Sequence, residues 1–133
     1  MGISFSLRGQ TDTSFNYIDK KLDNCLSDTA GVMGQNYCLH TAIEDWTKEM
    51  NKTLTLLSDI LSPEQKQKLA TAQEKWKLYK NSEVELAEKL EKAYFDQNPS
   101  ILVYPQIVIE REMNIIKTRV ADLINYYNLL KSK

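Results

Sequence analysis

Apolar residues recur along most of the chain at helical spacings, and short polar or proline-containing segments separate the runs. The first run lies on one helix face, with spacings of 3, 4 and 3 residues: Phe15, Ile18, Leu22 and Cys25. It predicts a short helix that ends before Ser27. Residues 28–31 are expected to form a connection.

A longer apolar stripe follows this connection and predicts a second helix: Leu39, Ile43, Trp46, Met50, Leu54, Leu57 and Leu61. The start of a third helix is marked by four consecutive residues, Ser62-Pro63-Glu64-Gln65. They supply an N-cap serine, a proline at the first helical position and a glutamine three residues after the cap. A turn between two antiparallel helices is therefore expected here.

The third helix has apolar positions at heptad-like spacing that are expected to face the core: Leu69, Ala72, Trp76, Tyr79, Leu86, Leu90 and Ala93. Glu83 interrupts this stripe, at a point where the face rotates or meets water. Asn98-Pro99-Ser100 ends the helix, because a proline restricts the residue before it and is costly in a helix interior.

The apolar run 101–109 resembles a strand in composition, but Pro105 lies in its middle and no partner strand is predicted. It is interpreted as the start of a fourth helix. From Ile109 onward the apolar positions alternate 4 and 3 residues apart in a seam suited to antiparallel packing: Met113, Ile116, Val120, Leu123, Tyr127 and Leu130.

These elements predict an all-α fold, an elongated antiparallel helical bundle of three long helices plus a short N-terminal helix. A chain of 133 residues is long enough for one hydrophobic core. Four glycines and three prolines are too few for the turns of an all-β fold. We expect residues 1–14 to be a flexible segment and residues 15–133 to form a single domain.

The near-zero net charge argues against nucleic acid and anionic membranes as partners. The chain has 17 basic and 18 acidic residues, so no overall field would attract nucleic acid or an anionic membrane. No apolar stretch is long enough for a transmembrane segment. The first fifteen residues contain no apolar signal-peptide region, which fits either a cytosolic protein or the mature part of an exported one.

Cys25 and Cys38 are the only cysteines, and their positions differ by 38 − 25 = 13 residues. A disulfide would fit an oxidising compartment, whereas two buried free thiols would fit a cytosolic bundle. Two cysteines with the single histidine, His40, give at most three metal ligands, so no metal site is predicted.

Catalytic patterns are lacking in the sequence. His40 has only Glu44 near it in sequence, and the chain contains neither a Gly-x-Ser-x-Gly elbow nor a glycine-rich phosphate loop. The sequence therefore predicts no enzyme and no cofactor. Gln73, Trp76 and Lys80 are a separate feature, because they share one helix face at spacings of 3 and 4 and gather polar groups beside a tryptophan.

Several segments together resemble the LprI-like family of bacterial envelope proteins. Cys25 and Cys38 are followed by Asn51 within residues 46–51, by residues 61–66 and by the pattern Gln73-x-x-Trp76-x-x-x-Lys80. Residues 118–123 are similar to the family's closing arginine and leucine motif. The resemblance covers about residues 23–130.

The resemblance implies a secreted, periplasmic or lipid-anchored helical domain in which Cys25 and Cys38 form a disulfide. It also singles out a set of motif residues: Asn51, Gln73, Trp76, Lys80 and Arg119. These residues form either a binding site or a buried hydrogen-bonded brace between helices. Lys80 stands where the family usually has arginine, so a bidentate contact to a carboxylate is not expected there.

The leading functional hypothesis is a non-enzymatic binding protein of the bacterial envelope, such as a lysozyme inhibitor that presents an acidic or polar surface to a basic cleft. The alternative is a structural or assembly protein that self-associates, or pairs with another envelope protein, through part of the run 101–109. An enzyme is the third possibility, and it would need a cleft around the motif residues.

Overall fold

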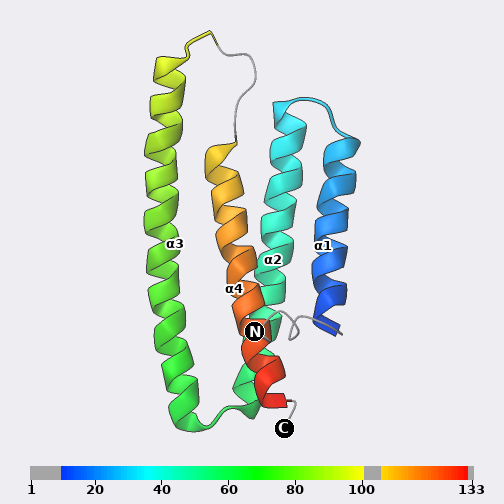
Figure 1. The fold of residues 1–133 in the computed structure, drawn as a ribbon, viewed down its shortest axis with the longest axis vertical. Coiled ribbons are helices and arrows are strands. Elements are labelled where there is room, and N and C mark those ends of the chain that lie inside the picture. Colours follow the sequence, from blue (N-terminus) through cyan, green and yellow to red (C-terminus); the bar gives the residue numbers. More distant parts are fainter. Residues whose placement is uncertain (1–9, 101–105, 132–133) are drawn as a thin grey trace.

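The computed structural model describes residues 10–100 and 106–131, with side chains from Tyr17 onward, and every regular element in these ranges is a helix. The helices are α1 (Gln10–Ser27), α2 (Val32–Ile60), α3 (Pro63–Gln97) and α4 (Ile107–Lys131). Figure 1 shows them as an elongated bundle. The all-α prediction is confirmed.

Two of the helix starts follow directly from local chemistry. Gly31 precedes α2 with a φ of 92°, a conformation that glycine adopts without the steric cost of a Cβ atom. At the start of α3, the Ser62 hydroxyl accepts a hydrogen bond from the Gln65 N–H, and the Gln65 side chain accepts one from the Ser62 N–H. This is the predicted capping box, with Pro63 at the first helical position.

Consecutive helices run antiparallel, as predicted, but the central pair does not. In Figure 1, α2 and α4 lie side by side and both run downward, while α1 and α3 run upward at the two edges. The most extensive packing joins α2 to α4, followed by α1 to α2 and α3 to α4. The seam of α4 thus faces mainly a parallel partner, and α3 returns the chain to the end at which α2 began.

The hydrophobic core lies between α2 and α4, with Ile18 of α1 packed against it. Trp46 and Leu57 of α2 and Val120 and Leu123 of α4 are almost completely buried. All four lie on the predicted apolar stripes. Burying large side chains at about 25 cal/mol per Å² of apolar surface makes this pair the main source of stability.

A disulfide joins α1 to α2. Cys25 and Cys38 are bonded, with Cα atoms 5.7 Å apart, as the family resemblance implied. Two ion pairs also hold α1. Lys21 pairs with Asp45 of α2 at 2.9 Å, and Asp19 pairs with Lys117 of α4 at 2.8 Å. The short first helix is therefore held covalently and electrostatically.

The helix α1 begins at Gln10, before Phe15, where the apolar spacing placed its start. Polar residues can extend a helix beyond its apolar face, and the spacing gave no signal for them. Residues 1–9 lie outside the described residues, and the flexible segment 1–14 stays a prediction. Residues 101–105 of the apolar run 101–109 also lie outside them, and α4 starts within that run, at Ile107.

One expectation for α3 is wrong. Tyr79, Leu86 and Leu90 were predicted to face the core, but they are 50%, 51% and 55% exposed, and Ala87 is the one buried residue of this helix. The reason is tertiary: α3 is an edge helix that packs mainly on α4 (Figure 1). One neighbour covers a narrower face than the two neighbours of a regular four-helix bundle would.

Within the described residues, no helix combines the length and apolar character that a membrane span requires.

Candidate functional site

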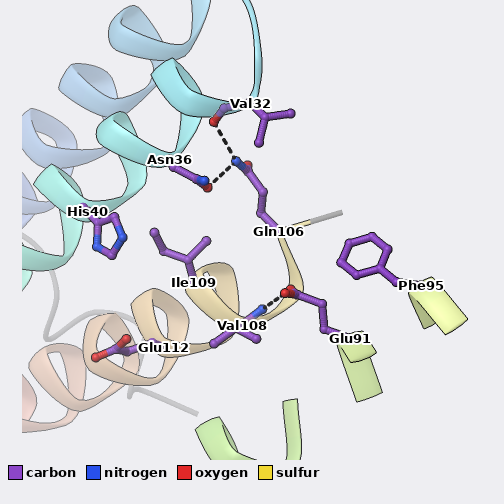
Figure 2. A pocket seen from close by; sticks show the side chains of 9 residues that line it. All are labelled: Val32, Asn36, His40, Glu91, Phe95, Gln106, Val108, Ile109 and Glu112. Carbon is purple, nitrogen blue, oxygen red and sulfur yellow. Dashed lines mark hydrogen bonds between the residues drawn. The ribbon is translucent and has the colours of Figure 1, made fainter. Parts of the chain in front are cut away.

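A pocket of about 440 Å³ lies where α2, α3 and the start of α4 meet (Figure 2). Its lining combines apolar and polar side chains from all three helices: Val32, Asn36, His40, Glu91, Phe95, Gln106, Val108, Ile109 and Glu112. The position of the pocket is fixed by the return of α3, which brings the beginning of α4 beside the beginning of α2.

Hydrogen bonds from α2 and α3 hold the start of α4 at this pocket. The Gln106 amide Nε2 donates to Asn36 Oδ1 at 2.6 Å and to the Val32 carbonyl at 3.5 Å. The Val108 N–H, in the first turn of α4, donates to Glu91 Oε1 at 3.3 Å. Glu91 of α3 thus satisfies a backbone donor at the positive end of α4, where an acidic side chain stabilises the helix.

The end of the bundle that carries the pocket is acidic. The acidic residues there come from the second half of α3 and the first turns of α4: Glu83, Glu85, Glu88, Glu91, Asp96, Glu110 and Glu112. The basic residues in the same segments are fewer: Lys89, Lys92 and Arg111. His40 adds an exposed imidazole from α2. The pocket is therefore a half-apolar hollow within a negatively charged surface, a combination suited to a cationic group.

Below the pocket, α3 and α4 are joined by a line of polar contacts that we call the polar seam. In the upper part of the seam, Lys80 Nζ of α3 pairs with the Glu112 carboxylate of α4 at 3.6 Å. Arg111 donates to Glu83 at 2.7 Å and to the Tyr79 hydroxyl at 3.2 Å. The hydrogen bond with Glu83 raises the pKa of Arg111 above its ordinary value, and the guanidinium remains charged.

The lower end of the polar seam contains the buried motif residues. Arg119 Nε donates to Gln73 Oε1 at 3.0 Å, and Gln73 Nε2 lies 3.5 Å from Met50 Sδ of α2. Arg119 is 9% exposed, and its Nη2 atom is buried without a hydrogen-bond partner among the described residues. Trp76 lies between the two ends, with Lys80 Nζ 6.0 Å from its ring centroid, at the outer limit of a cation–π contact.

The structure thus brings four of the five motif residues to one seam and leaves the fifth outside it. Gln73, Trp76 and Lys80 are half-buried on α3 and Arg119 is buried on α4, whereas Asn51 is exposed on α2. The recorded hydrogen bond near Asn51 uses its backbone carbonyl, which accepts from the Thr55 hydroxyl. Both predicted roles for these four residues, a brace between helices and a binding site, remain predictions.

Sequence reasoning missed most residues of the pocket. Asn36 and Gln106 are 70 positions apart, so nothing local links them. A weaker signal was available on α3. Gln73, Lys80, Glu83 and Glu91 recur near helical spacing, and each has a polar partner on α4, namely Arg119, Glu112, Arg111 and the Val108 N–H. Glu83, which interrupts the predicted apolar stripe, marks the flank of this seam.

The described residues contain no cluster of three His, Cys, Asp or Glu side chains that could hold a metal ion. His40 faces the pocket together with Glu112 (Figure 2). Glu44, its neighbour in sequence, does not line that pocket.

Comparison with known proteins gives one match. The family model described as lysozyme inhibitor LprI matches residues 24–123, which covers Cys25, Cys38, the polar seam and the pocket. No curated protein and no solved structure matches the chain. Because the match spans well over half of the 133 residues, the chain belongs to the LprI family.

Proposed function

We propose that this protein is a non-enzymatic, secreted or periplasmic binding protein that inhibits lysozyme through the acidic end of its helical bundle. Membership of the LprI family is the observation that carries this proposal. The Cys25–Cys38 disulfide supports the compartment, because such bonds persist in oxidising surroundings outside the cytosol.

The pocket is the part of the surface best suited to this role. Its rim carries Glu91 and Glu112, and its walls include Phe95 and Ile109, so a lysine or arginine side chain could place its stem on apolar groups and its charge beside carboxylates. Complementary charge would also speed the encounter with a cationic lysozyme and make binding sensitive to salt.

The test is an assay of cell-wall hydrolysis by a cationic lysozyme with increasing amounts of this protein. We expect saturable inhibition that weakens as the salt concentration rises. Unchanged hydrolysis at saturating protein would contradict the proposal.

Charge reversal tests which end of the bundle binds. Glu88 is exposed on α3, three residues before the pocket residue Glu91, and Glu88→Lys should weaken inhibition by about tenfold, mainly through slower association. Asp59→Lys is the matched control, because Asp59 is also exposed but lies in the last turn of α2, at the opposite end of the bundle (Figure 1). Equal loss with both variants would place the binding surface elsewhere.

A further inference from the structure

The outer side of α3 carries a line of exposed apolar residues that we call the α3 stripe: Ala72, Tyr79, Leu86, Leu90 and Ala93. Tyr79, Leu86 and Leu90 are each about half exposed and lie 7 and 4 positions apart, which places them on one side of the helix. Isolated exposed leucines are ordinary, but a line of large apolar side chains along one helix indicates a contact surface.

Most of the α3 stripe lies outside the contact between α3 and α4, the exception being the Tyr79 hydroxyl, which accepts a hydrogen bond from Arg111. Ala87 is the buried contact residue of α3, and Leu86, next to it in sequence, points about 100° away around the helix. Glu83 lies between Ala87 and the stripe around the helix, and Arg111 of α4 holds its carboxylate and the Tyr79 hydroxyl at this inner border of the stripe. The stripe is therefore a second face of α3, at the edge of the bundle (Figure 1).

The charges along α3 divide into two halves of opposite sign. Most charged residues of the first half are basic: Lys66, Lys68, Lys75, Lys77 and Lys80, against Glu64 and Glu74. Most charged residues of the second half are acidic: Glu83, Glu85, Glu88, Glu91 and Asp96, against Lys89 and Lys92. A second α3 laid antiparallel would place each basic half beside an acidic half. A parallel pair would place like charges together.

We propose that two copies of this protein pair through the α3 stripe in antiparallel orientation, about a twofold axis near Val84 and Glu85. In this register Tyr79 lies opposite Leu90 of the second copy, and the two Leu86 side chains lie near the axis. Such a self-complementary contact is what a twofold dimer requires. The pairing does not depend on lysozyme inhibition.

The same register pairs charges at both ends of the stripe. Lys75 and Asp96 flank the stripe on its solvent side, and each lies opposite the other residue of the second copy, in the g positions of an antiparallel coiled coil. Within one copy, Asp96 pairs with Lys92 at 3.0 Å, but both side chains are mostly exposed. Such an exposed pair contributes little and can exchange partners.

Sedimentation or light scattering over a range of protein concentrations tests the pairing, and a dimer at high concentration is expected. Leu86→Gln with Leu90→Gln should raise the dissociation constant of the dimer more than tenfold and leave the helix content unchanged, since both side chains are already half exposed. Leu78→Gln is the matched control, because Leu78 is 66% exposed on the same helix but off the stripe, and it should leave the dimer unchanged.

Charge exchange tests the orientation. Lys75→Asp or Asp96→Lys alone should weaken the dimer, and the double variant should restore it, because the two charges then face each other with their signs reversed. A protein that stays monomeric up to millimolar concentration would overturn the proposal. So would a dimer that is indifferent to the Leu86 and Leu90 substitutions, or a monomer in which those substitutions abolish lysozyme inhibition instead.

Discussion

Arg119 carries a positive charge into the interior between α3 and α4. The residue is 9% exposed, and its Nε atom donates a hydrogen bond to a neutral amide, Gln73 Oε1. Burying a charge is expensive unless hydrogen bonds replace its water, so the amide of Gln73 matters more here than an exposed glutamine would. This geometry favours a brace between α3 and α4.

We predict that Gln73→Leu lowers the free energy of unfolding by about 1–3 kcal/mol, because Arg119 Nε then loses its partner while still buried. Adding Arg119→Met should recover most of this loss, since an apolar side chain of similar length needs no partner. Urea denaturation measures both effects. Asn51→Ala, an exposed member of the motif, is the control and should change the unfolding energy little.

The outcome separates the two interpretations of the motif. A brace predicts lower stability of the Gln73 variant with unchanged lysozyme inhibition. If Gln73→Leu left the unfolding curve unchanged and abolished inhibition, Gln73 and Arg119 would belong to the binding site instead.

At the scale of the elements, α1 depends on its attachments. It packs on α2 through Ile18, and it is tied by the disulfide from Cys25 and by the ion pair from Lys21 to Asp45. The hydrogen bond with Asp45 raises the pKa of Lys21 above its ordinary value of 10.5, so this ion pair persists across the neutral range. Because exposed ion pairs contribute little, the disulfide is the strongest of the attachments that hold α1.

Replacing both cysteines, Cys25→Ser with Cys38→Ser, should lower the free energy of unfolding by about 3 kcal/mol in the chain-entropy treatment of a loop of this size. Thermal unfolding with and without a reducing agent measures the effect. The wild-type melting temperature should fall on reduction, and that of the double variant should not change. A wild-type protein indifferent to reduction would show that packing alone holds α1.

Elements defined by local chemistry were predictable, and those defined by their neighbours were not. Ser62, Pro63 and Gln65 fixed the start of α3 because a capping box is complete within four residues. The exposure of Leu86 and Leu90 could not be deduced, because apolar spacing shows which side chains share a face but not which helix covers it.

The candidate site also has a part that local sequence predicts and a part that it does not. Gln73, Trp76 and Lys80 could be grouped because spacings of 3 and 4 place them on one helix face. The pocket could not be predicted, because its side chains come from three helices. Its hydrogen bond between Asn36 and Gln106 joins residues 70 positions apart.

At the scale of the whole molecule, burial is unequal between the helices. The buried faces of α2 and α4 carry most of the core, whereas α3 has one buried residue, Ala87, and adds partly buried side chains such as Leu69 and Trp76. Segments with few buried apolar contacts open at a lower free energy than the rest of a protein. The molecule is therefore a stable central pair with a less stable edge helix.

Native-state hydrogen exchange tests this division. Amides in the middle of α3 should exchange faster than those of α2 around Trp46 and of α4 around Val120, both 0% exposed. The measurement needs a dilute sample, so that pairing through the α3 stripe does not add protection. Equal protection of all three helices would contradict the unequal stability.

The parallel arrangement of α2 and α4 gives α3 the role of a crossover, like the connection that two parallel strands need before they can pair. To start α4 beside the start of α2, the chain must travel back along the bundle, and the 35 residues of α3 span about 52 Å at 1.5 Å per residue. The topology therefore fixes the length of α3. Because few of its side chains are buried, packing restricts few of its residue types. A helix in that position can exchange surface side chains, and so acquire new partners, with little effect on the core.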